Sequence, residues 1–170
     1  MTSRKLMLLG EIGVGKSSLV KRVLHNVFTG TYIPTIGVDV HKYVVHDAGP
    51  GRDQQVDIVI WDTDGNFGQA IFRHVYIKGA SGAMVVADAS RPLTIDRMLS
   101  LAEGFEDAFP GRPIALVLNK WDLVHDPDRY STPDGLARTR HSFLRTSAKT
   151  GDKVRDAFTT AATIMLRRGA

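Results

Sequence analysis

The sequence predicts an α/β fold with a mostly parallel sheet and one antiparallel edge strand. Apolar β-type runs alternate along the chain with segments of helical periodicity, as in strands connected through helices. Two of these runs, residues 82–88 and 113–119, are almost wholly hydrophobic, which is typical of strands covered on both faces. The turn sequence DAGPGR at residues 47–52 separates two β-rich runs and predicts an antiparallel hairpin.

The elements of the first third follow in order. Residues 5–9, KLMLL, form the first strand, and residues 15–26 carry apolar side chains at helical spacing. The β-rich runs 38–46 and 54–62 are the two strands of the predicted hairpin. The chain therefore begins as strand, helix and hairpin.

The middle of the chain contains the two strands that are expected to be buried. Between residues 82–88 and 113–119, residues 92–108 read as a helix that begins at Pro92, a residue that suits the first helical turn. This strand–helix–strand order predicts a parallel pair.

The last third is less regular at first and then helical. Residues 123–140 are interrupted by proline and glycine, so any helix there is expected to be short. A weaker strand follows at 141–147, and residues 152–168 carry one apolar helical stripe. With no repeat and no linker in its 170 residues, the chain is expected to form a single domain, residues 1–170.

Composition narrows the class of protein. Hydrophobic residues make up 43% and charged residues 24%, which argues against disorder. There is no cysteine, so disulfides, thiolate metal sites and a cysteine nucleophile are excluded. The net charge of +4 comes without a dense basic run, so it indicates a solvated basic face, which would also suit a small anionic ligand. No nucleic-acid partner is expected.

No signal for a membrane is found in the sequence. No apolar run approaches the roughly 20 residues that a membrane span needs. Thr2 excludes myristoylation, and the final residues, LRRGA, contain no prenylation box. We therefore expect a cytoplasmic protein without its own lipid anchor, which reaches membranes only through partners.

The strongest chemical motif follows the first strand. Residues 10–17 read GEIGVGKS and match G-x-x-x-x-G-K-[ST], the loop whose backbone N–H groups surround phosphates at a helix N-terminus. Lys16 is expected to reach the terminal phosphates, and the Ser17 hydroxyl to hold Mg²⁺. The predicted phosphate-binding residues are Gly13, Val14, Gly15, Lys16, Ser17 and Ser18.

A second motif points to guanine. Residues 119–122, NKWD, follow an apolar strand at the edge of the sheet where ligands bind in such folds. The Asp122 carboxylate can accept two hydrogen bonds from guanine N1–H and N2–H₂, which adenine does not offer. Asn119 and the stem of Lys120 belong to the same predicted base site. A weaker signal, TSAK, follows the last strand and adds Ser147, Ala148 and Lys149.

Residues 61–65, WDTDG, end the second hairpin strand. Considered alone, this stretch is an ordinary turn, because aspartate and glycine after an apolar run are common turn formers. Its meaning depends on the rest of the chain.

The segments 10–18, 28–39, 61–65, 119–122 and 146–149 together resemble the small GTPases of the Ras superfamily, in the Rab style, over about residues 4–168. In lacking a prenylation box, the chain resembles prokaryotic-type members of the superfamily. The resemblance implies a P-loop G domain with a six-stranded sheet, one antiparallel edge strand and about five helices. It also implies a monomeric GTPase that binds GTP and GDP with Mg²⁺.

The resemblance also implies roles for particular residues. Phe28 would contact the guanine edge, while Tyr32 and Thr35 would lie in the first switch, with Thr35 on Mg²⁺ and the γ-phosphate. Asp62 would bind Mg²⁺ through a water, and Gly65 would donate its N–H to the γ-phosphate. The implied catalytic set is Lys16, Thr35, Gly65 and Asn66, and the implied metal set is Ser17, Thr35 and Asp62.

Partners are implied by the same resemblance. An unidentified effector, exchange factor and activating protein would contact the first switch, from Tyr32 to Val38, and the second switch at Phe67, Ile71 and Phe72. Three apolar residues in the second switch form either a docking patch or packing against the sheet.

The second switch departs from the family pattern. The family usually has Ala-Gly-Gln-Glu where this chain has Asp64, Gly65, Asn66 and Phe67. The family's glutamine orients the attacking water, and Asn66 is one methylene shorter, so slow intrinsic hydrolysis is predicted. Asp64 would repel the γ-phosphate unless it points away, binds Mg²⁺ or orients the water. Ile12 is stiff and bulky and could crowd the water-positioning amide.

Two rival functions remain open at this point. The departures motivate a scaffold that binds GTP without hydrolysing it. A P-loop kinase is the other rival, and it would favour ATP, whereas NKWD predicts a preference for guanine.

Overall fold

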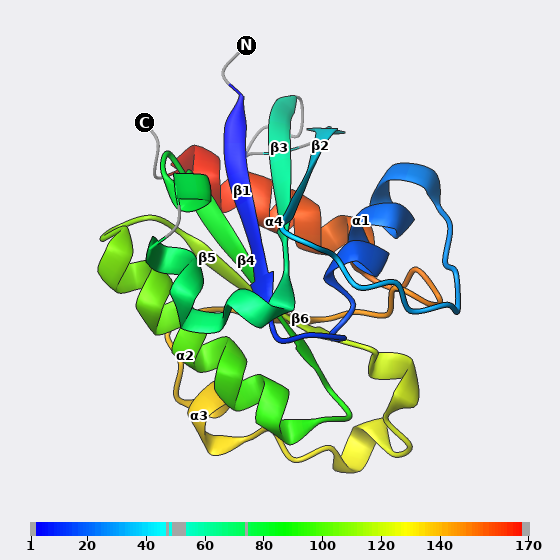
Figure 1. The fold of residues 1–170 in the computed structure, drawn as a ribbon. Helices are drawn as coiled ribbons and strands as arrows, with labels where there is room; N and C mark the ends of the chain where they lie inside the picture. The colour runs from blue at the N-terminus through cyan, green and yellow to red at the C-terminus, as the bar shows by residue number, and fades with distance from the viewer. Residues whose placement is uncertain (1–2, 47, 49–53, 74, 168–170) are drawn as a thin grey trace.

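The computed structural model describes residues 3–46, 48, 54–73 and 75–167, and a six-stranded sheet lies at its centre (Figure 1). The strands are β1 (Arg4–Gly10), β2 (Val38–Val45), β3 (Val56–Thr63), β4 (Gly82–Asp88), β5 (Ile114–Asn119) and β6 (Phe143–Arg145). Their order is β2-β3-β1-β4-β5-β6, and β2 alone among the described strands runs antiparallel to its neighbour. The predicted fold class is confirmed.

Helices and short helical turns connect the strands. The α-helices are α1 (Lys16–His25), α2 (Pro92–Ala108), α3 (Asp134–Ala137) and α4 (Val154–Arg167). The 3-10 segments are Gly65–Arg73, Val75–Ile77, Trp121–Leu123 and Pro127–Arg129. The helix predicted from Pro92 is confirmed, and residues 123–140 contain only short helical turns. The connection predicted at residues 47–52 lies, apart from Ala48, outside the described residues.

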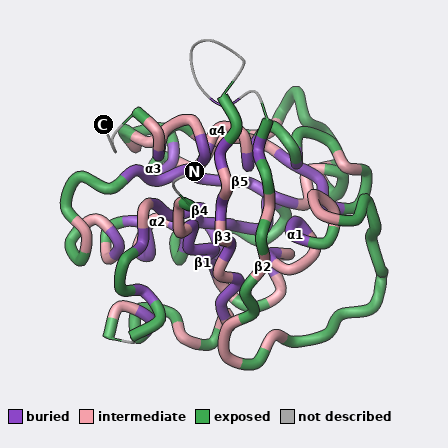
Figure 2. The backbone as a smooth tube through the Cα atoms, turned by 90° about the horizontal axis from the view of Figure 1, so that it is seen from above, coloured by how far each residue is buried: buried purple, intermediate pink, exposed green. Residues whose placement is uncertain are grey.

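Two apolar cores cover the two faces of the sheet. Because side chains alternate along a strand, Leu6 and Leu8 of β1 pack with α1 and α4, whereas Met7 and Leu9 pack with α2 on the other face. Figure 2 shows the central strands as mostly buried and the edge strand β2 as largely exposed. Within the described residues, no helix combines the length and the apolar character that a membrane crossing requires.

The strand register brings the carboxyl ends of four strands to one edge of the sheet. Leu8 pairs with Asp62, Gly10 pairs with Val86, and Asp88 pairs with Asn119. The loops that follow these strands carry the predicted motifs, so the fold gathers them at this edge, where ligands bind in open α/β sheets.

Gly104 provides the surface of α2 on which the segment Gly65–Arg73 docks. Gln69 Nε2 donates to the carbonyl oxygen of Ser100 at 2.6 Å and to its Oγ at 2.8 Å. A Cβ on Gly104 would lie 2.4 Å from Gln69 Oε1 and 2.5 Å from a ring carbon of Phe72. The absence of a side chain at this position therefore allows the close approach.

We expect Gly104→Ala to detach this segment from α2 without unfolding the helix. Alanine favours a helix by about 1 kcal/mol over glycine, but its methyl group would displace Gln69 and Phe72. In hydrogen exchange, the amides of residues 65–73 should exchange about tenfold faster while those of α2 keep their protection. Glu103→Ala, at an exposed neighbouring position, is the control. Unchanged exchange in Gly104→Ala would show that the docking does not depend on this contact.

Candidate nucleotide and magnesium site

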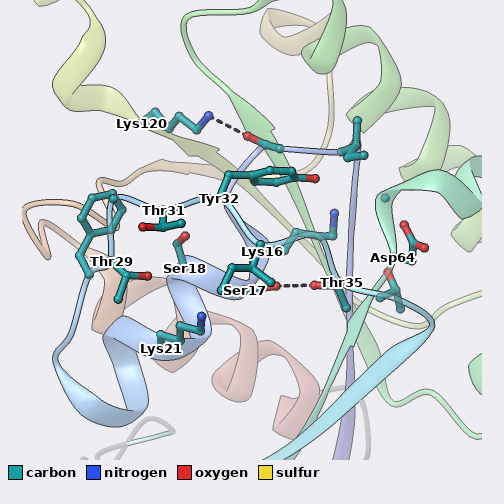
Figure 3. Close-up of a pocket in the computed structure, with 18 residues that line it drawn as sticks. Lys16, Ser17, Ser18, Lys21, Thr29, Thr31, Tyr32, Thr35, Asp64 and Lys120 are labelled. Carbon is teal, nitrogen blue, oxygen red and sulfur yellow. Dashed lines mark hydrogen bonds between the residues drawn. The ribbon is translucent and has the colours of Figure 1, made fainter.

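A pocket opens at the carboxyl edge of the sheet (Figure 3). Lys120 lies at one end of it, while Thr35 and Asp64 lie at the other. The pocket is lined by the predicted residues Gly13, Gly15, Lys16, Ser17, Ser18, Phe28, Tyr32, Thr35, Gly65 and Lys120. Val14 is buried, and Asn66 is exposed. The structure thus brings together residues from four separate stretches of the chain.

The loop from residue 10 to residue 15 has every carbonyl group occupied by a donor of the protein. Lys16 Nζ donates to the carbonyls of Gly10 at 2.9 Å and Glu11 at 3.1 Å. Arg91 Nη2 donates to the Ile12 carbonyl at 3.0 Å, and Lys120 Nζ donates to the Gly13 carbonyl at 2.7 Å. Asn119 Nδ2 donates to the Val14 carbonyl and the Leu19 N–H to the Gly15 carbonyl, both at 3.0 Å. Gly13 and Gly15 adopt left-handed conformations, with φ of 73° and 100°. Successive N–H groups in such turns form a concave anion site, and the N-terminus of α1 adds its positive end.

Lys16 is the buried cation of this loop, with a relative exposure of 6%. Burial lowers the pKa of Lys16, although the carboxylates of Asp62, Asp64 and Glu11 oppose that effect. A buried ammonium group is stabilised when an anion comes close to it. The loop, the lysine and the helix end therefore suit a phosphate group.

Three oxygen-bearing side chains meet beside Lys16. Ser17 Oγ and Thr35 Oγ1 are 2.8 Å apart, and Ser17 also donates to Asp62 Oδ2. Asp62 Oδ1 is buried and has no hydrogen-bond partner among the described residues. Burial raises the pKa of Asp62, and the hydrogen bond from Ser17 and the charge of Lys16 oppose it.

This set fits Mg²⁺, which prefers oxygen ligands and often keeps waters between itself and a carboxylate. Ser17 and Thr35 would be direct ligands, and the free oxygen of Asp62 suits an ordered water. The described residues contain no group of three or more His, Asp and Glu side chains placed for a metal ion. At this position the protein supplies the two hydroxyl groups and the Asp62 carboxylate.

The predicted base-recognition residues form a hydrogen-bonded cluster. Asp122 Oδ1 accepts from Ser147 Oγ at 2.5 Å, and Asn119 Oδ1 accepts from the Ala148 N–H at 3.1 Å and from Thr146 Oγ1 at 3.2 Å. Asn119 thus connects the loop after β6 to the phosphate loop. The bond from Ser147 orients the Asp122 carboxylate, as recognition of a base edge requires.

Arg22 on α1 is a site residue that the sequence analysis missed. Its Nε donates to the Ala148 carbonyl at 2.8 Å and its Nη2 donates to the Lys149 carbonyl. These bonds attach the base-recognition loop to α1. No local pattern in the sequence indicates this contact, because its partners lie 126 and 127 positions away.

Asp64 caps its own loop. Its Oδ1 accepts from the Asn66 backbone N–H at 2.8 Å, and its own N–H donates to the Gly37 carbonyl at 2.9 Å. Gly65 lies against the phosphate loop, since a Cβ there would be 2.5 Å from Ile12 N. Of the roles left open for Asp64, this geometry favours a carboxylate turned toward its own backbone.

Ile71 requires a correction. We expected partners to read the second switch at Phe67, Ile71 and Phe72, but Ile71 has a relative exposure of only 1%. It belongs to the core on the α2 face, and Phe67 and Phe72 pack against that core. The apolar spacing in this segment therefore reflects packing at Ile71, and in this conformation a partner cannot contact it. The first switch is more exposed, with Ile36 at 89%.

Asp88, also missed by the sequence analysis, is a buried carboxylate at the end of β4. It has a relative exposure of 2% and accepts from Arg91 Nε at 3.0 Å and from Lys120 Nζ at 2.8 Å. Burial alone raises the pKa of Asp88, but hydrogen bonds from Lys120 and Ser90 outweigh burial and lower it. Its place at the end of an apolar strand, like Asp62 and Asn119, is the signal that could have found it.

We expect Asp88→Asn to reduce the free energy of unfolding at pH 7 by about 1.5–3 kcal/mol, the usual range for hydrogen bonds to charged groups. A carboxyl group whose pKa is lowered by folding stabilises the native state above its unfolded pKa. That contribution is lost as the pH falls from 3.8, the ordinary pKa of an aspartate, through the lower pKa of the folded state. Urea titrations from pH 7 to pH 2.5 should therefore show the parent and the variant converging in acid. A constant difference would contradict this assignment.

The chain is similar in sequence to a known protein family and to several of its members. A model described as the Ras family matches residues 5–167. The Ras-related protein Rab-32C of Dictyostelium discoideum is 30% identical over 96% of this chain and 74% of that protein. RabC and Rab-32A of the same organism are each 31% identical, over 91% and 85% of this chain and 79% and 69% of their own lengths.

Proposed function

The chain belongs to the Ras family of small GTPases, and from that premise we propose that it is a guanine-nucleotide switch that hydrolyses GTP slowly with Mg²⁺. One observation carries the proposal. Lys16, Ser17 and Thr35 line one pocket, and Asp62, bonded to Ser17, completes the first cluster. Lys120 lines the same pocket and lies in the chain between Asn119 and Asp122 of the second cluster, in which Ser147 donates to Asp122. The first cluster suits phosphates with a cation, and the second suits a guanine base.

The residues of the chain would contribute mainly by positioning and by charge. Lys16 would bind the β- and γ-phosphates, and Phe28 would lie against the base. Mg²⁺, held by Ser17, Thr35 and a water on Asp62, would neutralise charge on the phosphates. The Gly65 N–H would donate to the γ-phosphate and would join the second switch to the state of the nucleotide.

Hydrolysis of GTP would be slow because the water that attacks the γ-phosphate would be poorly oriented. Asn66 lies at the position of the family's glutamine, is exposed, and is one methylene shorter. Asp64 Oδ1 accepts from the Asn66 N–H, which supports a carboxylate turned toward its own backbone rather than one that orients the attacking water. Partners would read the first switch, from Tyr32 to Val38, together with the exposed part of the second switch. We also keep a single domain over residues 1–170, a monomeric state and a cytoplasmic location as proposals.

Single-turnover phosphate release from protein loaded with GTP and Mg²⁺ tests the proposal. Release over minutes to hours, together with retention of GTP over ATP, is expected. Lys16→Ala should lose release even when loading, checked by chromatography, is complete. Lys21→Ala is the matched control, because Lys21 lines the same pocket but is exposed. No release within a day from fully loaded parent protein would contradict hydrolysis and leave a GTP-binding scaffold, while a preference for ATP would contradict the switch.

A further inference from the structure

Arg91 and Asp88 lie beside the phosphate loop but outside its motif. Arg91 precedes α2, and its guanidinium group spans from Asp88 to the phosphate loop. Its Nη2 donates to the Ile12 carbonyl at 3.0 Å, and a Cβ on Gly13 would lie 3.5 Å from the same nitrogen. The guanidinium group therefore lies directly along the outer side of the loop.

Asp88 holds two cations at once. Its Oδ2 accepts from Arg91 Nε at 3.0 Å and from Lys120 Nζ at 2.8 Å. Lys120 in turn donates to the Gly13 carbonyl at 2.7 Å. Two adjacent carbonyls of the phosphate loop are thus bound by two cations that share one buried carboxylate oxygen.

This arrangement has a consequence for the ligand. An N–H group can point toward a phosphate only if the neighbouring carbonyl points elsewhere and is satisfied there. Arg91 and Lys120 satisfy the carbonyls of Ile12 and Gly13 on the side away from the phosphates. The same oxygen of Asp88 also fixes Lys120, whose stem is predicted to lie along the guanine base. One carboxylate therefore connects the phosphate and base halves of the site.

We infer that Arg91 and Asp88 are positioning residues that retain the nucleotide, by holding the phosphate loop and Lys120 in their binding geometry. The inference rests on the proposed guanine-nucleotide function and adds two residues to its site. Since the β-phosphate is common to both nucleotides, the pair should slow dissociation of GDP and GTP by the same factor. A residue that contacts only the γ-phosphate would affect GTP alone.

The test is dissociation of fluorescent N-methylanthraniloyl GDP and GTP, chased with excess unlabelled GDP in the presence of Mg²⁺. Arg91→Ala should speed the loss of both nucleotides about tenfold, which corresponds to about 1.4 kcal/mol. Asp88→Asn should have a larger effect, because it releases two cations, and Arg91→Ala should add less than threefold in that background. Arg91→Lys should restore part of the retention.

Arg97→Ala is the matched control. Arg97 lies further along α2, and its Nε is 3.6 Å from Glu11 Oε2, so it pairs with a side chain of the phosphate loop and not with a carbonyl. Its removal should change dissociation less than twofold, because exposed ion pairs contribute little. If Arg91→Ala does not fold, Arg91→Gln, which keeps most of the aliphatic stem, replaces it in the comparison with Arg97→Ala.

Two results would overturn the inference while leaving the proposed function intact. The first is parent-like dissociation in both Arg91→Gln and Asp88→Asn. The second is a hundredfold loss of hydrolysis with unchanged dissociation, which would make Arg91 a catalytic residue. Failure of the parent protein to retain any guanine nucleotide would instead contradict the proposed function itself.

Discussion

Replacing Asp122 by alanine is expected to weaken GTP binding on the order of 10²–10⁴-fold and to abolish the preference for guanine over adenine. Two hydrogen bonds from guanine to an ionised carboxylate are lost, each of which contributes about 1.5–3 kcal/mol. Competition of GTP, GDP and ADP against a fluorescent GDP measures the effect. Asp122→Ala that binds GTP as tightly as the parent would show that the base lies elsewhere.

Two variants separate recognition from support at this position. Ser147→Ala removes the hydroxyl that donates to Asp122 Oδ1 at 2.5 Å but keeps the carboxylate, so a loss of only about tenfold is expected. Asp122→Asn exchanges one acceptor for a donor and should therefore favour a xanthine nucleotide, whose O2 is an acceptor. The same competition with xanthosine diphosphate checks this change of preference.

Asn66→Gln is expected to accelerate single-turnover hydrolysis of GTP by up to about 10²-fold. The added methylene extends the reach of the amide by over an angstrom, and a positional error of about 1 Å can cost that factor. Asn66 is exposed, and its N–H donates to Asp64 Oδ1 through the backbone, so the substitution leaves this bond in place. Phosphate release from fully loaded protein is the measurement.

Asn66→Ala is the control for this substitution, because it keeps the backbone bond and removes the amide. It should hydrolyse GTP no faster than the parent, and nucleotide dissociation should stay unchanged in both variants. A glutamine variant with parent-like or slower hydrolysis would show that reach is not the limit. Asp64, whose charge acts on Lys16, or the conformation of the loop would then set the rate.

The sequence alone determined the fold class and the order of the elements. The strands β4 and β5 are wholly buried, and a uniformly apolar run carries that information locally. Pro92 marked the start of α2 because its fixed φ suits a first helical turn. The phosphate loop was equally readable, since a phosphate is bound by consecutive backbone groups and the glycines that shape them are adjacent in sequence.

Only the tertiary structure decided how the site is supported. Arg91 and Ile12 are separated by 79 positions, and Arg22 and Ala148 by 126, so the strand order and register that bring them together are not written in any local pattern. Local sequence also cannot place Ile71, because its apolar side chain suits either a docking surface or the core. In the folded chain Ile71 packs in the core on the α2 face. Local chemistry identifies the groups that can touch a nucleotide, whereas the path of the whole chain selects the side chains that hold those groups in place.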